Sequence, residues 1–153
     1  MKELIEKLKR EGKLREQKVA WVQIEGLLKD ALRDIREAKA VLTVGERSPF
    51  LMAYQSMLKA GRSLLFLEGL RPADGSQHRT VILVCETLLG SRFKALAEQF
   101  ETMRRKRNQL TYEYGGLVTH DETKNALTDA EEWIHAVLEK AKAVNPQFEL
   151  PLQ

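Results

Sequence analysis

Cysteine is nearly absent from this sequence, since Cys85 is the only one among 153 residues. A single thiol forms no disulfide within the chain, so nothing calls for an oxidising compartment. Long apolar runs are absent too, and the longest, at 81–85, is far too short to cross a bilayer. The first residues mix charged with apolar side chains and lack the apolar block of a signal peptide. We therefore expect a soluble, cytoplasmic protein with no membrane partner.

The short motifs that mark common enzyme classes are also missing. The sequence has no glycine-rich phosphate loop, no Gly-x-Ser-x-Gly elbow and no cysteine pair spaced for zinc. Its three histidines, His78, His120 and His135, lack metal-ligand spacing, and we interpret each as a surface or loop residue. No metal and no cofactor are predicted. Cys85 has no basic residue three or four positions away, which favours a small core side chain over a reactive thiol.

Charge is abundant but unevenly distributed. Charged residues make up 31% of the chain and hydrophobic residues 43%, which is enough to bury a core at this length. Residues 1–112 hold 22 Lys and Arg against 14 Asp and Glu, whereas residues 113–153 hold 3 against 8. A basic body with an acidic final segment could bind an anionic partner on one face and a basic one on another. An unevenly charged, solvated surface would explain the same pattern.

Apolar residues recur every three or four positions along nearly the whole chain, which is typical of amphipathic helices. Ser48 before Pro49 predicts a capped helix start. Thr119 and Glu122 have the spacing of a capping box. The pair Ala60-Gly61 would let another backbone approach closely. The predicted helices cover about 21–42, 48–69, 78–89, 92–112 and 119–144.

The links between these helices are short, which favours antiparallel neighbours. The sequence therefore predicts an all-α fold, an up-and-down antiparallel helical bundle of about five helices. Residues 1–146 would form a single domain, with 1–14 as an N-terminal helical extension. Residues 69–77 form a link rich in turn formers, and residues 147–153 a loose C-terminal tail.

Four consecutive cations run from Arg104 to Arg107. Each helical residue turns by about 100°, so four in a row cannot share one face. Arg107 follows apolar positions 96, 100 and 103 by helical steps, which places it on the apolar stripe. An arginine there needs an anionic or carbonyl partner, or a second subunit, because burying it alone is costly. An ion pair with a neighbouring helix is the simplest structural explanation.

Other polar groups fall beside Arg107. Asn108 and Tyr112 are four apart and can share a helical face, and Tyr114 falls near the same line if the helix continues. An arginine fork, an amide and two phenols suit a phosphate group. The candidate residues for binding a phosphate group are Arg104, Arg105, Arg107, Asn108 and Tyr114.

Two blocks of the chain resemble the HEPN domain family, most closely its small stand-alone prokaryotic members. The first is 53–72, AYQSMLKAGRSLLFLEGLRP, followed by HRTVILV at 78–84. The second is Arg107-Asn-Gln-Leu-Thr-Tyr-Glu-Tyr114, which is similar to the family signature Arg-x4–6-His, often extended as Arg-Asn-x-x-x-His-x-Tyr. The resemblance covers the helices from Trp21 to Leu138 and implies a homodimer with Arg107 near its two-fold axis.

In family members that cut RNA, the resemblance implies metal-free cleavage by Arg and His at the dimer interface. Arg107 and Tyr112 are the corresponding catalytic candidates, with Tyr112 at the histidine position. Tyrosine has an unperturbed pKa of about 10 and histidine one of about 6.5, so tyrosine is a poor general base at neutral pH. The resemblance therefore favours a module that binds nucleotide or RNA. It also implies a toxin–antitoxin or nucleotidyltransferase-associated setting, in which a partner nucleotidyltransferase would modify Tyr114.

Two alternatives stay open at this point. The protein could be an active, metal-independent endoribonuclease in which Tyr112 or His120 takes the role of the motif histidine. It could also be a helical scaffold whose cationic run is a solvated surface.

Overall fold

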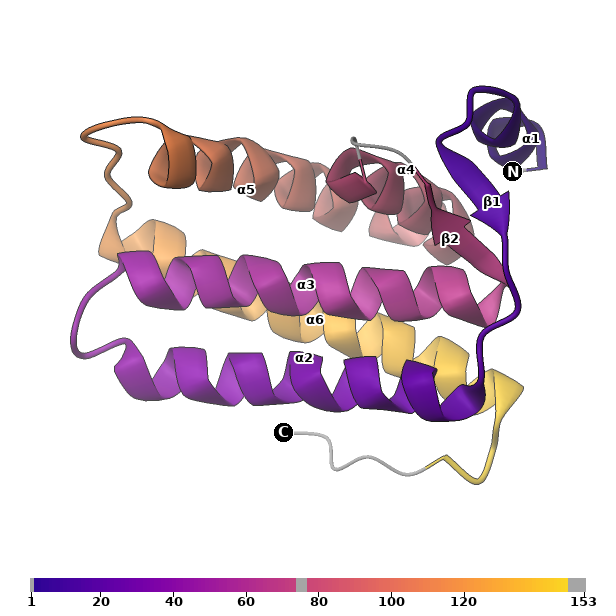
Figure 1. The fold of residues 1–153 in the computed structure, drawn as a ribbon. Coiled ribbons are helices and arrows are strands. Elements are labelled where there is room, and N and C mark those ends of the chain that lie inside the picture. Colours follow the sequence, from indigo (N-terminus) through magenta and orange to yellow (C-terminus); the bar gives the residue numbers. More distant parts are fainter. Residues whose placement is uncertain (1, 74–76, 149–153) are drawn as a thin grey trace.

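Helix α3 (Arg47–Leu67) runs through the centre of the molecule and contacts four other helices. Twelve of its 21 residues are buried, as a helix surrounded by neighbours requires. Figure 1 shows α2 and α6 on one side of α3 and α4 and α5 on the other. The structure is a computed structural model that describes residues 2–73 and 77–148. The other helices there are α1 (Lys2–Arg10), α2 (Trp21–Val41), α4 (Gln77–Leu89), α5 (Lys94–Tyr112) and α6 (His120–Val144).

The prediction of an all-α bundle is confirmed, with helices making up 77% of the structure. The predicted helices correspond to α2 through α6, and the N-terminal extension contains α1. A short 3₁₀ turn, η1 (Ser91–Phe93), precedes α5 and occupies the first residues of the predicted fourth helix. No helix in the described part of the chain combines the length and apolar character needed to cross a membrane.

An aromatic column joins three helices at the core. Trp133 of α6 is fully buried and donates its indole N–H to the carbonyl oxygen of Met57 on α3, at 3.0 Å. Its ring packs edge-on against Phe100 of α5, with centroids 4.9 Å apart. Phe100 in turn packs against Tyr54 of α3 at 5.5 Å. These contacts anchor α5, the helix that carries the cationic run, to the centre of the bundle.

Gly61 lets α4 lie close against α3, as its position in the sequence predicted. A Cβ atom there would lie 2.7 Å from Cγ1 of Val81 and 3.3 Å from Sγ of Cys85, both on α4. Both side chains are fully buried. Any larger residue at position 61 would therefore push α4 away from α3.

The structure contains a small two-stranded sheet that the sequence did not predict. Strand β1 (Leu14–Glu16) pairs antiparallel with β2 (Leu70–Pro72), which lies inside the predicted 69–77 link. Three residues are too few for an alternating pattern to be detected. The pairing ties α1 to the end of α3, as Figure 1 shows. The remainder of the predicted link includes 74–76, which lie outside the described residues.

The predicted helix starts had different outcomes. The Thr119–Glu122 capping box is confirmed, with both reciprocal hydrogen bonds present. The prediction that Ser48 caps α3 is wrong, because α3 begins at Arg47 and has no side-chain cap. Proline is tolerated anywhere in the first turn, where amides lack intrahelical partners, so Pro49 does not mark the first residue. The Arg47 side chain instead donates to the carbonyl oxygen of Leu110 on α5, at 2.7 Å.

The end of α6 and the start of the predicted tail are also described. Asn145 ends α6, as predicted. Phe148 is buried and packs edge-on against Trp21, with centroids 5.0 Å apart. The second residue of the predicted tail is therefore packed on the bundle and not loose, and residues 149–153 lie outside the described part of the chain.

Candidate functional site

A cavity of about 650 Å³ lies where the C-terminal half of α5 meets the start of α4. It brings together four residues that sequence analysis proposed: Arg104, Arg107, Asn108 and Tyr112. The complete lining is His78, Arg79, Arg104, Arg107, Asn108, Tyr112 and Glu113. Three arginines face one acidic side chain in this set, so the cavity is cationic and suits an anionic ligand.

Arg107 lies at the margin of the buried face of α5. It comes four residues after buried Met103 and three before buried Leu110, so its side chain is half-buried. Its Nη1 donates to Oδ1 of Asn108 at 3.2 Å, and its guanidinium carbon lies 5.5 Å from the centre of the Tyr112 ring. A guanidinium has five N–H donors, and these contacts use few of them.

The other cations of the run 104–107 each lie within ion-pair distance of a carboxylate. Arg104 makes a bidentate contact with Glu101, with distances of 2.6 to 3.1 Å, and Lys106 lies 3.5 Å from Glu122. Within residues 2–73 and 77–148, Arg107 has no ion-pair partner. The ion pair with a neighbouring helix that would explain a buried arginine is therefore not found there.

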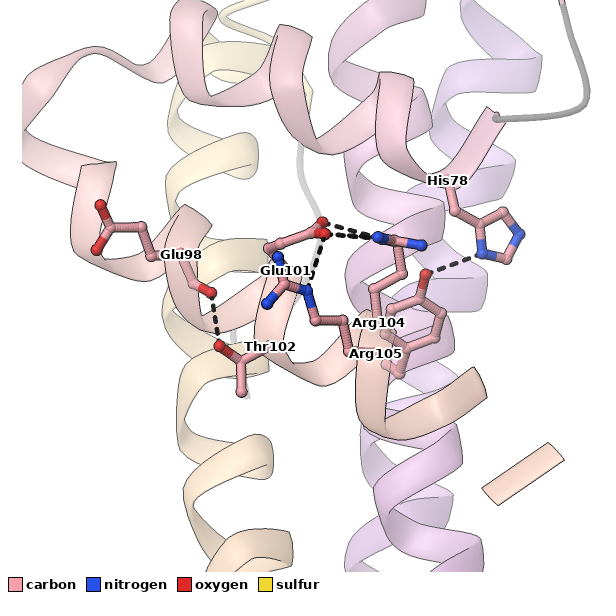
Figure 2. Close-up of polar contacts among 7 residues, drawn as sticks. His78, Glu98, Glu101, Thr102, Arg104 and Arg105 are labelled. Atoms are coloured by element: carbon pink, nitrogen blue, oxygen red, sulfur yellow. Dashed lines mark hydrogen bonds and ion pairs between the residues drawn. The ribbon is translucent and has the colours of Figure 1, made fainter. Parts of the chain in front are cut away.

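Figure 2 shows Glu101 between the side chains of Arg104 and Arg105. The hydrogen bond from Arg104 is the main reason that the pKa of the Glu101 carboxyl lies below its ordinary value. Arg105 is exposed, lies 3.7 Å from the same carboxylate and does not line the cavity. Glu101 therefore stays ionised and holds Arg104 at the cavity wall, while Arg105 faces solvent.

Two other sequence candidates lie outside the cavity. Helix α5 ends at Tyr112, so Tyr114 leaves the helical line, is fully exposed and does not line the cavity. The imidazole of His120 lies 3.1 Å from a carboxylate oxygen of Glu46, at the loop before α3. His120 does not line the cavity either.

His78 is the residue that sequence analysis left out of the site. It lies in the first turn of α4, and its Nδ1 is 2.8 Å from the hydroxyl oxygen of Tyr54 on α3. Burial lowers the pKa of His78, and the nearby charges of Arg107, Arg62 and Arg104 lower it further. The available signal was Tyr54, because a tyrosine on a buried helical face needs a polar partner for its hydroxyl. That signal does not say which residue the partner is.

The interpretation of Cys85 as a core residue is confirmed. Its side chain is fully buried, and burial raises the pKa of the thiol, so it stays protonated. No group of three or more His, Cys, Asp or Glu side chains arranged to hold a metal ion occurs where the structure places the chain.

Comparison with known families confirms the resemblance noted in the sequence. The family model described as the HEPN domain matches residues 24–141, which run from α2 to near the end of α6. This range contains every residue that lines the cavity. A search of curated proteins finds no match to the chain.

Proposed function

The chain belongs to the HEPN domain family, and we propose that it binds the phosphate groups of a nucleotide or of RNA in the cavity around Arg107. HEPN domains often bind RNA and dimerise. The observation that carries the proposal is Arg107 itself, a half-buried arginine without a carboxylate partner among the described residues. Such a guanidinium is ready to form a bidentate contact with phosphate oxygens.

The rest of the cavity supports a phosphate ligand. The Asn108 side chain accepts a hydrogen bond from the Arg107 guanidinium, and the Tyr112 ring packs against the same guanidinium. Arg104 and Arg79 add positive charge to the same cavity. Tyr112 is 74% exposed, so its ring has surface left on which a base can stack.

We expect the protein to bind single-stranded RNA with an affinity that falls steeply with salt. Ligand phosphates would release counterions when they meet Arg107, Arg104 and Arg79, and the logarithm of the association constant should fall linearly with that of the salt concentration. Fluorescence anisotropy with a labelled oligouridylate at several salt concentrations measures the slope. ATP as competitor distinguishes a nucleotide site from an RNA site. Absence of binding to both ligands would leave the scaffold alternative.

We further propose that the protein is a homodimer with Arg107 near the two-fold axis. Large apolar side chains are exposed at the end of the bundle where α5 ends and α3 begins, including Val44 at 86% and Leu117 at 81%. The same groove is lined by Leu110, which lies three residues after Arg107 on α5, so a second copy that covered it would lie near Arg107. Sedimentation equilibrium tests this assembly, and a monomer at all concentrations would contradict it.

The fully exposed Tyr114 is consistent with the role of a modification target in a toxin–antitoxin pair. Its phenol is accessible to a nucleotidyltransferase, whereas Tyr54 is buried. We expect a mass increase of the peptide that carries Tyr114 after incubation with a cognate nucleotidyltransferase and ATP. The Tyr114→Phe variant is the control, and an equal mass increase in that variant would exclude the assignment.

The second candidate function is metal-independent RNA cleavage. The contact between Arg107 and Tyr112 favours it, because both groups can reach one phosphodiester in the cavity. Neither geometry nor chemistry supports His120 in this role, since it pairs with Glu46 outside the cavity. Cleavage of RNA by the unmodified protein in EDTA, leaving a 2′,3′-cyclic phosphate, would establish this function.

A further inference from the structure

His78 lies among the cationic groups of the cavity but carries a different chemistry. Tyr54 and Arg62 face it from α3, Arg79 lies beside it on α4, and Arg104 and Arg107 face it from α5. Arg104 is bound to Glu101, and Glu113 also lines the cavity. Figure 2 shows His78 beside Arg104, with one of its two ring nitrogens in a hydrogen bond. Nε2, the second nitrogen, has no protein partner among the described residues.

The contact with Tyr54 determines which nitrogen of His78 carries the proton. Tyr54 is 1% exposed, and burial raises the pKa of its phenol far above neutrality, so the hydroxyl keeps its proton. In the part of the chain that the structure describes, Nδ1 of His78 is the acceptor within reach of that proton, at 2.8 Å. The neutral imidazole therefore accepts at Nδ1 and carries its own proton on Nε2. A neutral N–H donor is thereby placed among arginines without adding to their mutual repulsion.

We propose that His78 is a phosphate ligand of the Arg107 cavity, donating its Nε2–H to a phosphate oxygen, and that the buried Tyr54 hydroxyl is a positioning group for its ring. The inference rests on the proposed function and adds a binding residue from α4 to those on α5. It does not make His78 a general base for the ligand, because the lone pair of the neutral ring lies on Nδ1, against Tyr54, and not on the Nε2 that meets the phosphate.

A pH dependence follows from the same geometry. In the free protein, burial and the charges of Arg107, Arg62 and Arg104 hold the pKa of His78 below its usual value, so the ring is neutral at pH 7. A bound phosphate opposes those charges and raises that pKa, so binding takes up a proton between the free and bound values. The imidazolium can then donate from both nitrogens, with the Tyr54 hydroxyl as acceptor of the Nδ1 proton. Affinity should therefore rise as the pH falls through this range.

The test compares variants of the full chain in anisotropy titrations with labelled oligouridylate at pH 8 and pH 6, with ATP in parallel. We expect His78→Ala to weaken binding about tenfold. His78→Gln keeps an N–H donor but does not titrate, so we expect near-normal affinity at pH 8 and loss of the extra affinity at pH 6. Tyr54→Phe should weaken binding several-fold while the far-ultraviolet circular dichroism stays unchanged. His135→Ala is the matched control, because His135 lies exposed on α6 beside Glu139.

Calorimetry in buffers of different ionisation enthalpy counts the protons taken up on binding. We expect uptake with the natural sequence and none with His78→Gln. Binding and proton uptake that are the same in His78→Ala and His78→Gln as in the natural sequence would overturn the role of His78, while a loss confined to Arg107→Ala would leave the proposed function standing. Failure of the natural sequence to bind either probe would overturn both proposals.

Discussion

Replacing Arg107 by alanine is expected to lower the affinity for RNA by about tenfold to a hundredfold. A charge-assisted hydrogen bond contributes about 1.5–3 kcal/mol, and each 1.4 kcal/mol corresponds to a factor of about ten in affinity. Because Arg107 has no carboxylate partner within the described ranges, its removal leaves no buried anion behind. The thermal unfolding midpoint should therefore change little. Anisotropy titration and a thermal melt of the same sample measure both effects.

Arg105→Ala is the matched control for this experiment. It removes the same charge two residues away, from an exposed side chain that does not line the cavity. We expect a loss of affinity of less than about threefold, because only the long-range field of the protein changes. Equal losses in the two variants would show that RNA binds to the cationic surface in general and not to the cavity.

Replacing Tyr112 by histidine is expected to produce RNA cleavage in EDTA, or to accelerate it by about 10²–10⁴-fold if the natural sequence cleaves slowly. Proton transfer by a positioned group contributes rate factors of this size. Position 112 lines the cavity beside Arg107. Histidine is the side chain whose ordinary pKa lies closest to neutral pH, which suits it to proton transfer. Gel electrophoresis of labelled RNA, with detection of the 2′,3′-cyclic phosphate end, measures the product.

Two further variants test whether the new activity depends on the position of the histidine and on Arg107. Tyr114→His places the same side chain beyond the end of α5, outside the cavity, and should stay inactive. Tyr112→His combined with Arg107→Ala should also be inactive, because the phosphate would lose its guanidinium contact. Cleavage that survives in the double variant would contradict a mechanism centred on Arg107.

The existence and extent of the helices follow from local chemistry. Apolar residues at every third or fourth position define one buried face per helix. The Thr119–Glu122 capping box fixes the residue at which α6 begins. Helix packing was predictable from local sequence at Gly61. A residue without a side chain on a buried helical face indicates that a neighbouring helix lies close to it. Ser48 shows where local reasoning fails. Helix α3 begins one residue earlier, at Arg47, whose side chain hydrogen-bonds to the carbonyl oxygen of Leu110, 63 positions away in the chain.

The residues of the candidate site also divide into those that local sequence predicted and those that it did not. Arg104, Arg107, Asn108 and Tyr112 were predictable as one group because they lie within nine residues of one helix, whose hydrogen bonds fix their relative positions. Tyr114 left this group only because α5 ends two residues earlier, at a turn where Gly115 adopts a φ of 80°.

By itself, then, the sequence determined the bundle, the cationic run and the position of Arg107 at the edge of a buried face. Only the tertiary structure decided that the carboxylate of Glu122 compensates Lys106, and that His78 joins the cavity with its ring held by Tyr54. The physical reason is that these contacts depend on how α3, α4, α5 and α6 lie against one another. That arrangement is set by the simultaneous fit of many buried side chains. The spacing of apolar residues along the chain shows which face of each helix is buried, but not which helix packs against it.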